Sequence, residues 1–201
     1  MFEFSRVKGI IFDLDDTLVK TSLDFGMLKK QIECPLDADI LTYIEELSCP
    51  NQQKLATDIV LQHELDDART SKWMPGAKEF VQAAAEEGLP LAIVTRNCKA
   101  ATELKVKQNA IPIECIITRE DAPAKPDPTA LLMIAAQWQT APSELAYIGD
   151  YIYDIQAAHN GQLQAWLFDD KHITPQQTGA KQSVAHYIFA QKLRYIAPIC
   201  G

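Results

Sequence analysis

The chain of 201 residues has no apolar run that approaches the roughly 20 residues required for a membrane-spanning helix. Residues 1–6 also lack the apolar segment, set between a basic start and a small-residue cleavage site, that marks a secretory signal. These two absences argue against a membrane protein and predict one that stays in the cytoplasm.

Cysteine is scarce, and its spacing shows no pairing. The chain has five cysteines, an odd number, and no two of them form a C-x-x-C motif. Their positions are Cys34, Cys49, Cys98, Cys115 and Cys200. A disulfide framework and a zinc site are therefore disfavoured, and each cysteine is predicted to be a reduced thiol that fills apolar space.

Positive charge is in deficit. The 19 Lys and Arg against 27 Asp and Glu give a net charge of −8, so the chain lacks the basic character of nucleic-acid-binding proteins and would be repelled by anionic membranes. An anionic substrate would need cations placed locally at its binding site. With 47% apolar and 23% charged residues the composition is globular, and the length suits one domain, or one core with a small appendage.

Short apolar runs recur along the chain, and helical segments separate most of them. The runs cover residues 7–12, 91–94, 115–117, 145–148 and 162–168, and the helical segments cover residues 78–87, 99–108, 128–139 and 152–160. Runs this short and this apolar are typical of strands buried on both faces of a parallel sheet. The alternation predicts an α/β protein with a Rossmann-like, three-layer core around a parallel sheet.

One segment, residues 20–74, interrupts this alternation because it holds no convincing strand. Its helical stretches are residues 24–32, 39–47 and 52–72. We therefore expect a small all-helical domain over residues 20–74, inserted after the first strand into a core formed by residues 1–19 and 75–201. After residue 169 the chain is weakly patterned, apart from an apolar stretch over residues 184–196.

Ligands of open α/β sheets bind beyond the carboxyl ends of the strands, and polar side chains follow four of the predicted strands. These side chains are Asp13 and Asp15, Thr95 with Arg96 and Asn97, Lys125, and Asp150 with Asp154. Taken singly, each has a simpler interpretation: an aspartate as a helix cap or solvated turn, Thr95 as a strand residue, Lys125 as a surface lysine. Their arrival at one edge of the sheet favours a common site.

The side chains at this edge suit the transfer of a phosphoryl group. A carboxylate such as Asp13 can attack phosphorus and form an acyl phosphate, while a second carboxyl group, Asp15, can protonate the leaving group and later activate water. The prolines around Lys125 would aim its ammonium at a phosphoryl group. Clustered carboxylates repel one another, and hard oxygen ligands in this number suit Mg²⁺.

Together these residues resemble the motifs of the haloacid-dehalogenase superfamily of phosphatases. The matching residues are Asp13-Leu14-Asp15-Asp16-Thr17-Leu18 for its first motif, Thr95 for the second, Lys125 for the third, and Gly149-Asp150 with Asp154 for the fourth. Order and spacing agree over nearly the whole chain. Within the superfamily the sequence looks most like phosphoglycolate-phosphatase-type hydrolases, and the inserted helices resemble the small helical cap of these enzymes.

The resemblance implies a role for each matching residue. Asp13 would be the nucleophile and Asp15 the general acid/base. The phosphate-binding residues would be Thr95, Arg96, Asn97 and Lys125. The Mg²⁺ ligands would be Asp13, the backbone carbonyl of Asp15 and Asp150, with Asp154 in an outer shell or against a metal-bound water.

One position departs from the superfamily pattern. Many relatives carry glycine where this chain has Asp16, and glycine adopts a strained turn more readily than aspartate does. The aspartate also adds negative charge near the expected metal. We expect this variation to affect the catalytic rate slightly and to leave the reaction class unchanged.

The function implied by the resemblance is the Mg²⁺-dependent hydrolysis of a small phosphorylated metabolite. Dehalogenase and phosphonatase activities are disfavoured, because neither would be expected to keep an acid at Asp15. Two alternatives stay open: a sugar phosphomutase on the same scaffold, and a non-catalytic phosphate-binding protein. The second is ranked low, since it would be expected to lose one of the residues Asp13, Asp15, Lys125 and Asp150.

The substrate itself depends on the inserted helices. A cation on them that faces the core would favour an anionic leaving group such as glycolate. The candidate polar residues are Lys29, Lys30, His63, Glu64, Arg69 and Lys72. Each of these is more simply interpreted as part of a solvated helix face.

Overall fold

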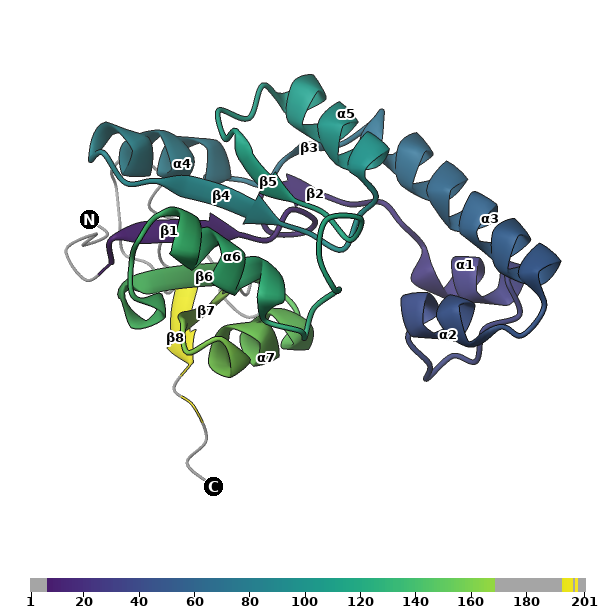
Figure 1. Cartoon of the computed structure of the whole chain (residues 1–201). Helices are drawn as coiled ribbons and strands as arrows, with labels where there is room; N and C mark the ends of the chain where they lie inside the picture. The colour runs from purple at the N-terminus through teal and green to yellow at the C-terminus, as the bar shows by residue number, and fades with distance from the viewer. Residues whose placement is uncertain (1–6, 169–192, 197, 199–201) are drawn as a thin grey trace.

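The computed structural model describes residues 7–168, 193–196 and 198. The strands of its main sheet are β1 (Gly9–Phe12), β4 (Leu91–Val94), β5 (Cys115–Ile117), β6 (Leu145–Gly149), β7 (Gln164–Phe168) and β8 (Leu193–Ile196). They lie in the order β5-β4-β1-β6-β7-β8, and β8 alone runs antiparallel to its neighbour (Figure 1). The predicted α/β fold around a parallel sheet is confirmed. Of the apolar stretch expected over residues 184–196, the part before residue 193 lies outside the described residues.

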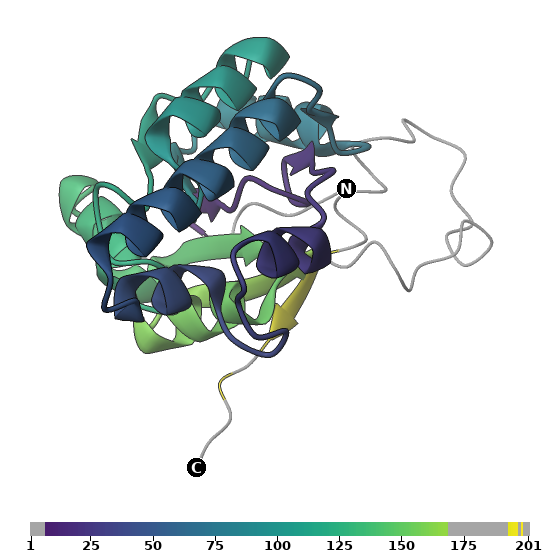
Figure 2. The ribbon, with the colours of Figure 1, turned by 90° about the vertical axis from the view of Figure 1, so that its right-hand side faces the viewer.

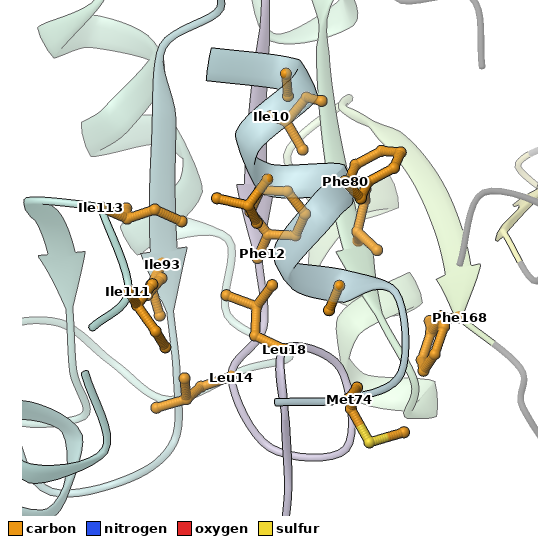
Figure 3. Close-up of a cluster of buried hydrophobic side chains, with 14 of the residues drawn as sticks. Ile10, Phe12, Leu14, Leu18, Met74, Phe80, Ile93, Ile111, Ile113 and Phe168 are labelled. Atoms are coloured by element: carbon orange, nitrogen blue, oxygen red, sulfur yellow. The ribbon is translucent and has the colours of Figure 1, made fainter. Parts of the chain in front are cut away.

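Helices cover both faces of the sheet, because its central strand is apolar on both sides. The covering helices are α4 (Ala77–Glu86) and α5 (Lys99–Asn109) on one face, and α6 (Thr129–Gln137) and α7 (Ile152–Asn160) on the other (Figure 1). In β1, Ile10 and Phe12 pack with α4, whereas Ile11 packs with α6 and α7. Figure 3 shows the first cluster, in which Phe12 and Phe80 meet edge to face with ring centroids 6.1 Å apart. This period-two alternation produces the three predicted layers.

A helical insertion, defined here as residues 21–71, separates β1 from the rest of the core. It holds α1 (Phe25–Gln31), α2 (Ile40–Glu46) and α3 (Pro50–Ala68). The chain enters it through β2 (Val19–Lys20) and leaves it through β3 (Lys72–Trp73), which pair antiparallel. The expectation that residues 20–74 contain no strand is therefore wrong for β3. A strand of two residues is too short to show the alternation by which strands are predicted.

The helical insertion has an apolar cluster of its own. Its buried members are Leu28, Ile32, Cys34, Ile40, Ile44, Ala56 and Val60. Asp24 begins α1 and Asp39 begins α2 as N-caps, each accepting a hydrogen bond from a backbone N–H of the first turn. The long helix α3 lies beside α5 of the core, where Ala68 packs with Ala101 (Figure 2). The insertion is thus held against the core along one side.

Two absences noted in the sequence can be compared with the structure. The four cysteines among the described residues are free thiols, as predicted, while Cys200 lies outside them. None of the helices in the described part of the chain is both long and apolar enough to cross a bilayer.

A 3₁₀ turn, η2 (Pro142–Glu144), precedes β6.

Candidate active site

The carboxyl ends of the central strands open into a cavity of about 580 Å³ between the core and the helical insertion. Asp13 follows β1, Thr95 follows β4 and Asp150 follows β6, and all three line this cavity. The backbone N–H of Asp13 donates to the carbonyl of Ile148 at 2.7 Å. This bond extends the pairing of β1 with β6 up to Asp13, so the carboxylate is carried on the rigid end of the sheet.

Lys125, in the loop between β5 and α6, is a buried cation of the site. Its ammonium donates to Asp13 Oδ1 at 2.7 Å, to Asp154 Oδ1 at 2.6 Å and to the hydroxyl oxygen of Tyr147 at 2.7 Å. Burial acts to lower the pKa of Lys125, but the carboxylates of Asp13 and Asp154 outweigh it and raise the pKa. The lysine therefore stays charged, although only 5% of its side chain is exposed.

Three carboxylates, two of which contact Lys125, cluster at the site. Asp13, Asp150 and Asp154 offer oxygens that all lie within 4.8 Å of one another. Burial raises the pKa of Asp150 to about 7, and the charges of Asp154 and Asp16 act in the same direction. Burial also raises the pKa of Asp13 well above its usual value, against the opposing effect of Lys125. A divalent cation would relieve this repulsion, and carboxylate oxygens are ligands that Mg²⁺ prefers, so these residues fit such an ion.

Asp154 sits behind the other two carboxylates and already holds protein donors on both oxygens. Its Oδ1 accepts from Lys125 and, at 3.0 Å, from Tyr147, and its Oδ2 accepts from the backbone N–H of Tyr151 at 3.0 Å. A Cβ on Gly149 would lie 2.3 Å from Cγ of Asp154, so no side chain fits there. These contacts favour Asp13 and Asp150 as direct metal ligands, with Asp154 outside them.

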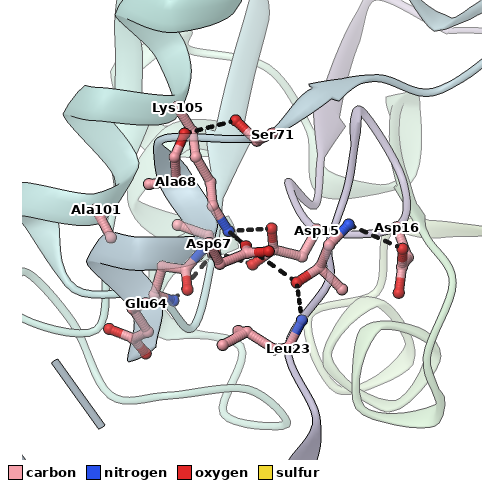
Figure 4. Close-up of polar contacts among 12 residues, drawn as sticks. Asp15, Asp16, Leu23, Glu64, Asp67, Ala68, Ser71, Ala101 and Lys105 are labelled. Atoms are coloured by element: carbon pink, nitrogen blue, oxygen red, sulfur yellow. Dashed lines mark hydrogen bonds and ion pairs between the residues drawn. The ribbon is translucent and has the colours of Figure 1, made fainter. Parts of the chain in front are cut away.

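Asp15 lies at the same edge, and both oxygens of its carboxylate are engaged. Asn97 Nδ2 donates to Oδ2 at 2.5 Å, and Lys105 of α5 forms an ion pair with Oδ1 (Figure 4). Burial raises the pKa of Asp15, and Lys105 and Asn97 oppose that rise. The sequence motifs did not single out Lys105. The available signal was its spacing, because Lys105 falls four residues after the buried Ala101, on the inward face of α5.

Asp16, the position at which many relatives carry glycine, has the backbone conformation that glycine favours. Its φ is 51°, in the left-handed region that aspartate tolerates better than most residues do. Its Oδ1 accepts a hydrogen bond from the backbone N–H of Thr21 at 3.1 Å, and its own N–H donates to the carbonyl of Val19 at 2.7 Å. The aspartate side chain thus stabilises the turn that leads into the helical insertion.

The three residues that follow β4 point to different partners. Asn97 reaches Asp15, and the hydroxyl of Thr95 accepts from the backbone N–H of Asn97 at 3.1 Å. Arg96 instead donates from Nη2 to both carboxylate oxygens of Asp39, at 2.7 and 2.8 Å, and lies 4.9 Å from the ring centroid of Tyr153. The guanidinium predicted to bind phosphate therefore bridges the core to the helical insertion along the wall of the cavity.

The interpretation of the polar residues of the insertion as solvated helix faces is wrong for Glu64. Its side chain is buried, forms an ion pair with Arg119 and accepts from the backbone N–H of Cys98 at 3.2 Å, because α3 turns this face toward α5. Lys29 lines the cavity and donates to the carbonyl of Leu36 at 2.6 Å. Of the other candidates, Lys30, Arg69 and Lys72 are exposed and His63 is half-buried.

The arrangement of these residues can be compared with known proteins. The family model described as haloacid dehalogenase-like hydrolase matches residues 10–167. The chain belongs to the haloacid dehalogenase-like hydrolase family. The matched region contains every predicted site residue from Asp13 to Asp154, and the expectation of an enzyme of this family is confirmed.

Relatives of this hydrolase support the same assignment. A haloacid dehalogenase-like hydrolase domain-containing protein of Arabidopsis thaliana is 28% identical over 161 residues, which cover 75% of this chain and 65% of that protein. The chain thus spans less than two thirds of this relative. A phosphoglycolate phosphatase of Thiobacillus denitrificans is 27% identical over 178 residues, covering 76% and 78% of the two chains. The crystal structure of a haloacid dehalogenase-like hydrolase from Bacteroides fragilis shares the fold, with a TM-score of 0.67, 18% identity, and coverage of 85% and 91%.

Proposed function

We propose that this hydrolase is a Mg²⁺-dependent phosphatase that cleaves a small phosphorylated metabolite through an aspartyl phosphate on Asp13. One observation carries most weight: a buried carboxylate at the end of the central strand faces the cavity, 2.7 Å from the buried ammonium of Lys125. The similarity to a phosphoglycolate phosphatase supports a phosphomonoester as the substrate.

In the first half-reaction the carboxylate of Asp13 attacks phosphorus. A bond forms between its oxygen and phosphorus as the bond from phosphorus to the ester oxygen breaks. Asp15 gives a proton to that ester oxygen, which leaves as an alcohol. Lys125 supports the step, because its ammonium contacts Asp13 and can also meet the negative oxygens of the phosphoryl group.

In the second half-reaction a water molecule replaces the departed alcohol. Asp15 takes a proton from this water as its oxygen attacks phosphorus, and the bond between phosphorus and Asp13 breaks. Inorganic phosphate leaves, Asp13 is a carboxylate again and Asp15 is protonated again. The same group serves as acid and then as base, which is why one residue beside Asp13 suffices.

The metal fits the acidic side of this site. Asp13, Asp150 and the backbone carbonyl of Asp15 would hold Mg²⁺, with Asp154 orienting Lys125 behind them. When bound, Mg²⁺ would supply charge neutralisation for a phosphoryl group that meets an anionic nucleophile. The cation Lys125 cannot balance the three clustered carboxylates by itself, since it carries one positive charge and contacts only Asp13 and Asp154 among them.

The helical insertion acts as a cap over the leaving group in this proposal, and its wall of the cavity is largely apolar. The apolar residues of this wall include Leu23, Phe25, Leu28, Leu36, Ile40 and Val60. Of the two cations that line the cavity, Arg96 is neutralised by Asp39, which leaves Lys29. A cavity of about 580 Å³ lies in the usual range of about 300–1,000 Å³ for small-molecule sites. This wall supports a leaving group that is larger and more apolar than glycolate.

A phosphate-release assay over a panel of esters tests the reaction. The panel contains p-nitrophenyl phosphate, phenyl phosphate, phosphoglycolate and a sugar phosphate, each measured in EDTA and after Mg²⁺ is added. We expect Mg²⁺-dependent release that Asp13→Asn abolishes, with a higher kcat/KM for phenyl phosphate than for phosphoglycolate. Absence of turnover on all four esters would contradict the reaction, isomerisation of the sugar phosphate would indicate a phosphomutase, and preference for phosphoglycolate would contradict the leaving-group assignment alone.

A further inference from the structure

Lys105 is a charged side chain with no exposed surface: its side-chain exposure is 0%. It projects from α5 toward the point where the chain enters and leaves the helical insertion (Figure 4). A buried ammonium is unfavourable unless anionic partners compensate for its lost hydration. Lys105 has two such partners, Asp15 and Asp67, and lies between them.

Asp67, near the end of α3, does not line the cavity, and its carboxylate contacts other protein groups. Its Oδ2 lies 2.7 Å from the ammonium of Lys105 and accepts from the hydroxyl of Thr21 at 3.0 Å. Its Oδ1 accepts from the backbone N–H and the hydroxyl of Ser22, at 2.6 and 2.8 Å. A carboxylate has about four acceptor sites, so Asp67 is saturated and its position is fixed.

Asp15 differs from Asp67 in keeping access to the cavity. It lines the cavity and 22% of its side chain is exposed. Lys105 holds one oxygen and Asn97 holds the other, so rotation of the carboxylate about its last side-chain bond is blocked. About two of its four acceptor sites stay open, which is what a group needs if it is to exchange a proton with a ligand.

We propose that Lys105 is a positioning residue for the general acid/base Asp15, and that Asp67 holds Lys105 in place. This role presupposes the phosphatase activity proposed above. Asp15 gives a proton in one half-reaction and receives one in the other. Asp67 takes no part in either, so Lys105 keeps an anionic partner throughout and does not move when Asp15 is protonated.

A positioning role has a kinetic signature that a purely structural role lacks. Proton donation by Asp15 matters most for an ester whose leaving group is a poor one, such as an alkyl alcohol, and little for p-nitrophenolate. Loss of Lys105 should therefore steepen the dependence of kcat/KM on the pKa of the leaving group. A general weakening of the fold would lower kcat/KM for all esters by the same factor.

The test compares the double variant Lys105→Met, Asp67→Asn with wild type and with Lys107→Met. The double variant removes one positive and one negative charge, so the net charge of the group formed by Asp15, Asp67 and Lys105 is unchanged. Lys107 lies on the exposed side of the same helix and serves as the control. Each protein is assayed with Mg²⁺ on a series of aryl and alkyl phosphates, and its melting curve is recorded.

We expect the double variant to lose about 100-fold in kcat/KM on alkyl phosphates, the scale of a misplacement of about 1 Å, and less than about fivefold on p-nitrophenyl phosphate. Lys107→Met should match wild type on every ester. An equal loss across the series, or no loss, in a folded variant would overturn the proposal. If the double variant does not fold, Lys105→Gln is measured instead, because the side-chain amide of glutamine can still donate hydrogen bonds. Failure of both variants to fold would also overturn the proposal. Inactivity of the wild type on every ester would refute the phosphatase itself.

Discussion

Replacing Asp150 by asparagine should stabilise the metal-free protein at high pH. The carboxyl group has a pKa of about 7 in the folded chain, because of burial and the charges of Asp154 and Asp16, against 3.8 for the ordinary group. This difference places a penalty of about 4 kcal/mol on the ionised form. A raised carboxyl pKa destabilises the folded state above pH 7, and the penalty declines to nothing as the pH falls from 7 to about 4. Asparagine has nearly the same shape and cannot ionise.

Melting curves in EDTA at pH 8 and pH 4.5 measure this effect. For a chain of this size about 1 kcal/mol corresponds to about 2–4 °C, so Asp150→Asn should melt up to about 8–16 °C above wild type at pH 8. The gain should fall to about a quarter of this at pH 4.5, because that pH lies close to the ordinary pKa of the carboxyl group. Asp58→Asn is a suitable control, because Asp58 is exposed and pairs with the exposed Lys54, so the melting temperature of this variant should change little at either pH.

Magnesium should narrow the difference in stability between the two proteins at pH 8. At about 100 times its dissociation constant a ligand contributes about 2.7 kcal/mol, which wild type gains and Asp150→Asn largely loses. A variant that is less stable than wild type in EDTA at both pH values would show that Asp150 serves the fold as a helix-start residue. A wild-type melting temperature that does not respond to saturating Mg²⁺, with metal-dependent activity kept in the variant, would refute the metal site.

Three further substitutions test the roles of single side chains. Asp13→Asn should lower kcat by about 10³-fold or more while the melting curve stays cooperative, since the amide cannot form the aspartyl phosphate; activity within tenfold of wild type would remove Asp13 from the mechanism. Asp15→Asn should slow both half-reactions, and with p-nitrophenyl phosphate a phosphorylated enzyme should accumulate in rapid-quench experiments, whereas equal loss on all esters with no trapped intermediate would assign Asp15 a structural role. Asp39→Asn should release the guanidinium of Arg96, which can then bind the carboxylate of phosphoglycolate. The ratio of kcat/KM for phosphoglycolate to that for phenyl phosphate should rise by about fivefold, which corresponds to one hydrogen bond of about 1 kcal/mol. An unchanged ratio would place Arg96 away from the leaving group.

The site residues that follow strands could be predicted from the sequence. Residues such as Asp13 and Asp150 come directly after apolar runs, and a parallel sheet carries such residues to one edge, so their proximity follows from local pattern and topology. The same logic gives the layers, because β1 is apolar at consecutive positions. Lys125 was predicted from its place after a strand and from the prolines beside it, although its loop shows no periodicity that would indicate an inward direction.

Contacts between helix faces could not be predicted from the sequence in the same way. Glu64 looks like an ordinary solvated position, and the spacing of Lys105 from Ala101 is a weak signal. The apolar stripe of α3 is weak because buried polar side chains share its packing on the core with alanine and leucine side chains. Which side of α3 meets α5 depends on how the insertion is seated, and no local propensity encodes that. The two-residue strand β3 was not predicted for a related reason: it pairs with β2, from which the whole insertion separates it in the sequence.

The pairing of Val19 with Trp73 also determines how the chain tolerates change in length. The residues that leave the core and return to it are neighbours in a ladder, so the segment between them behaves as a closed loop whose ends meet irrespective of its contents. The entropic cost of closing such a loop grows only with the logarithm of its length, so doubling the length raises the free energy of closure by about 0.6 kcal/mol. Insertions and deletions within residues 21–71 are therefore inexpensive for the sheet, provided that Asp67 and its partners are kept. The architecture allows the wall over the leaving group to be rebuilt while the chemistry at the strand ends is preserved.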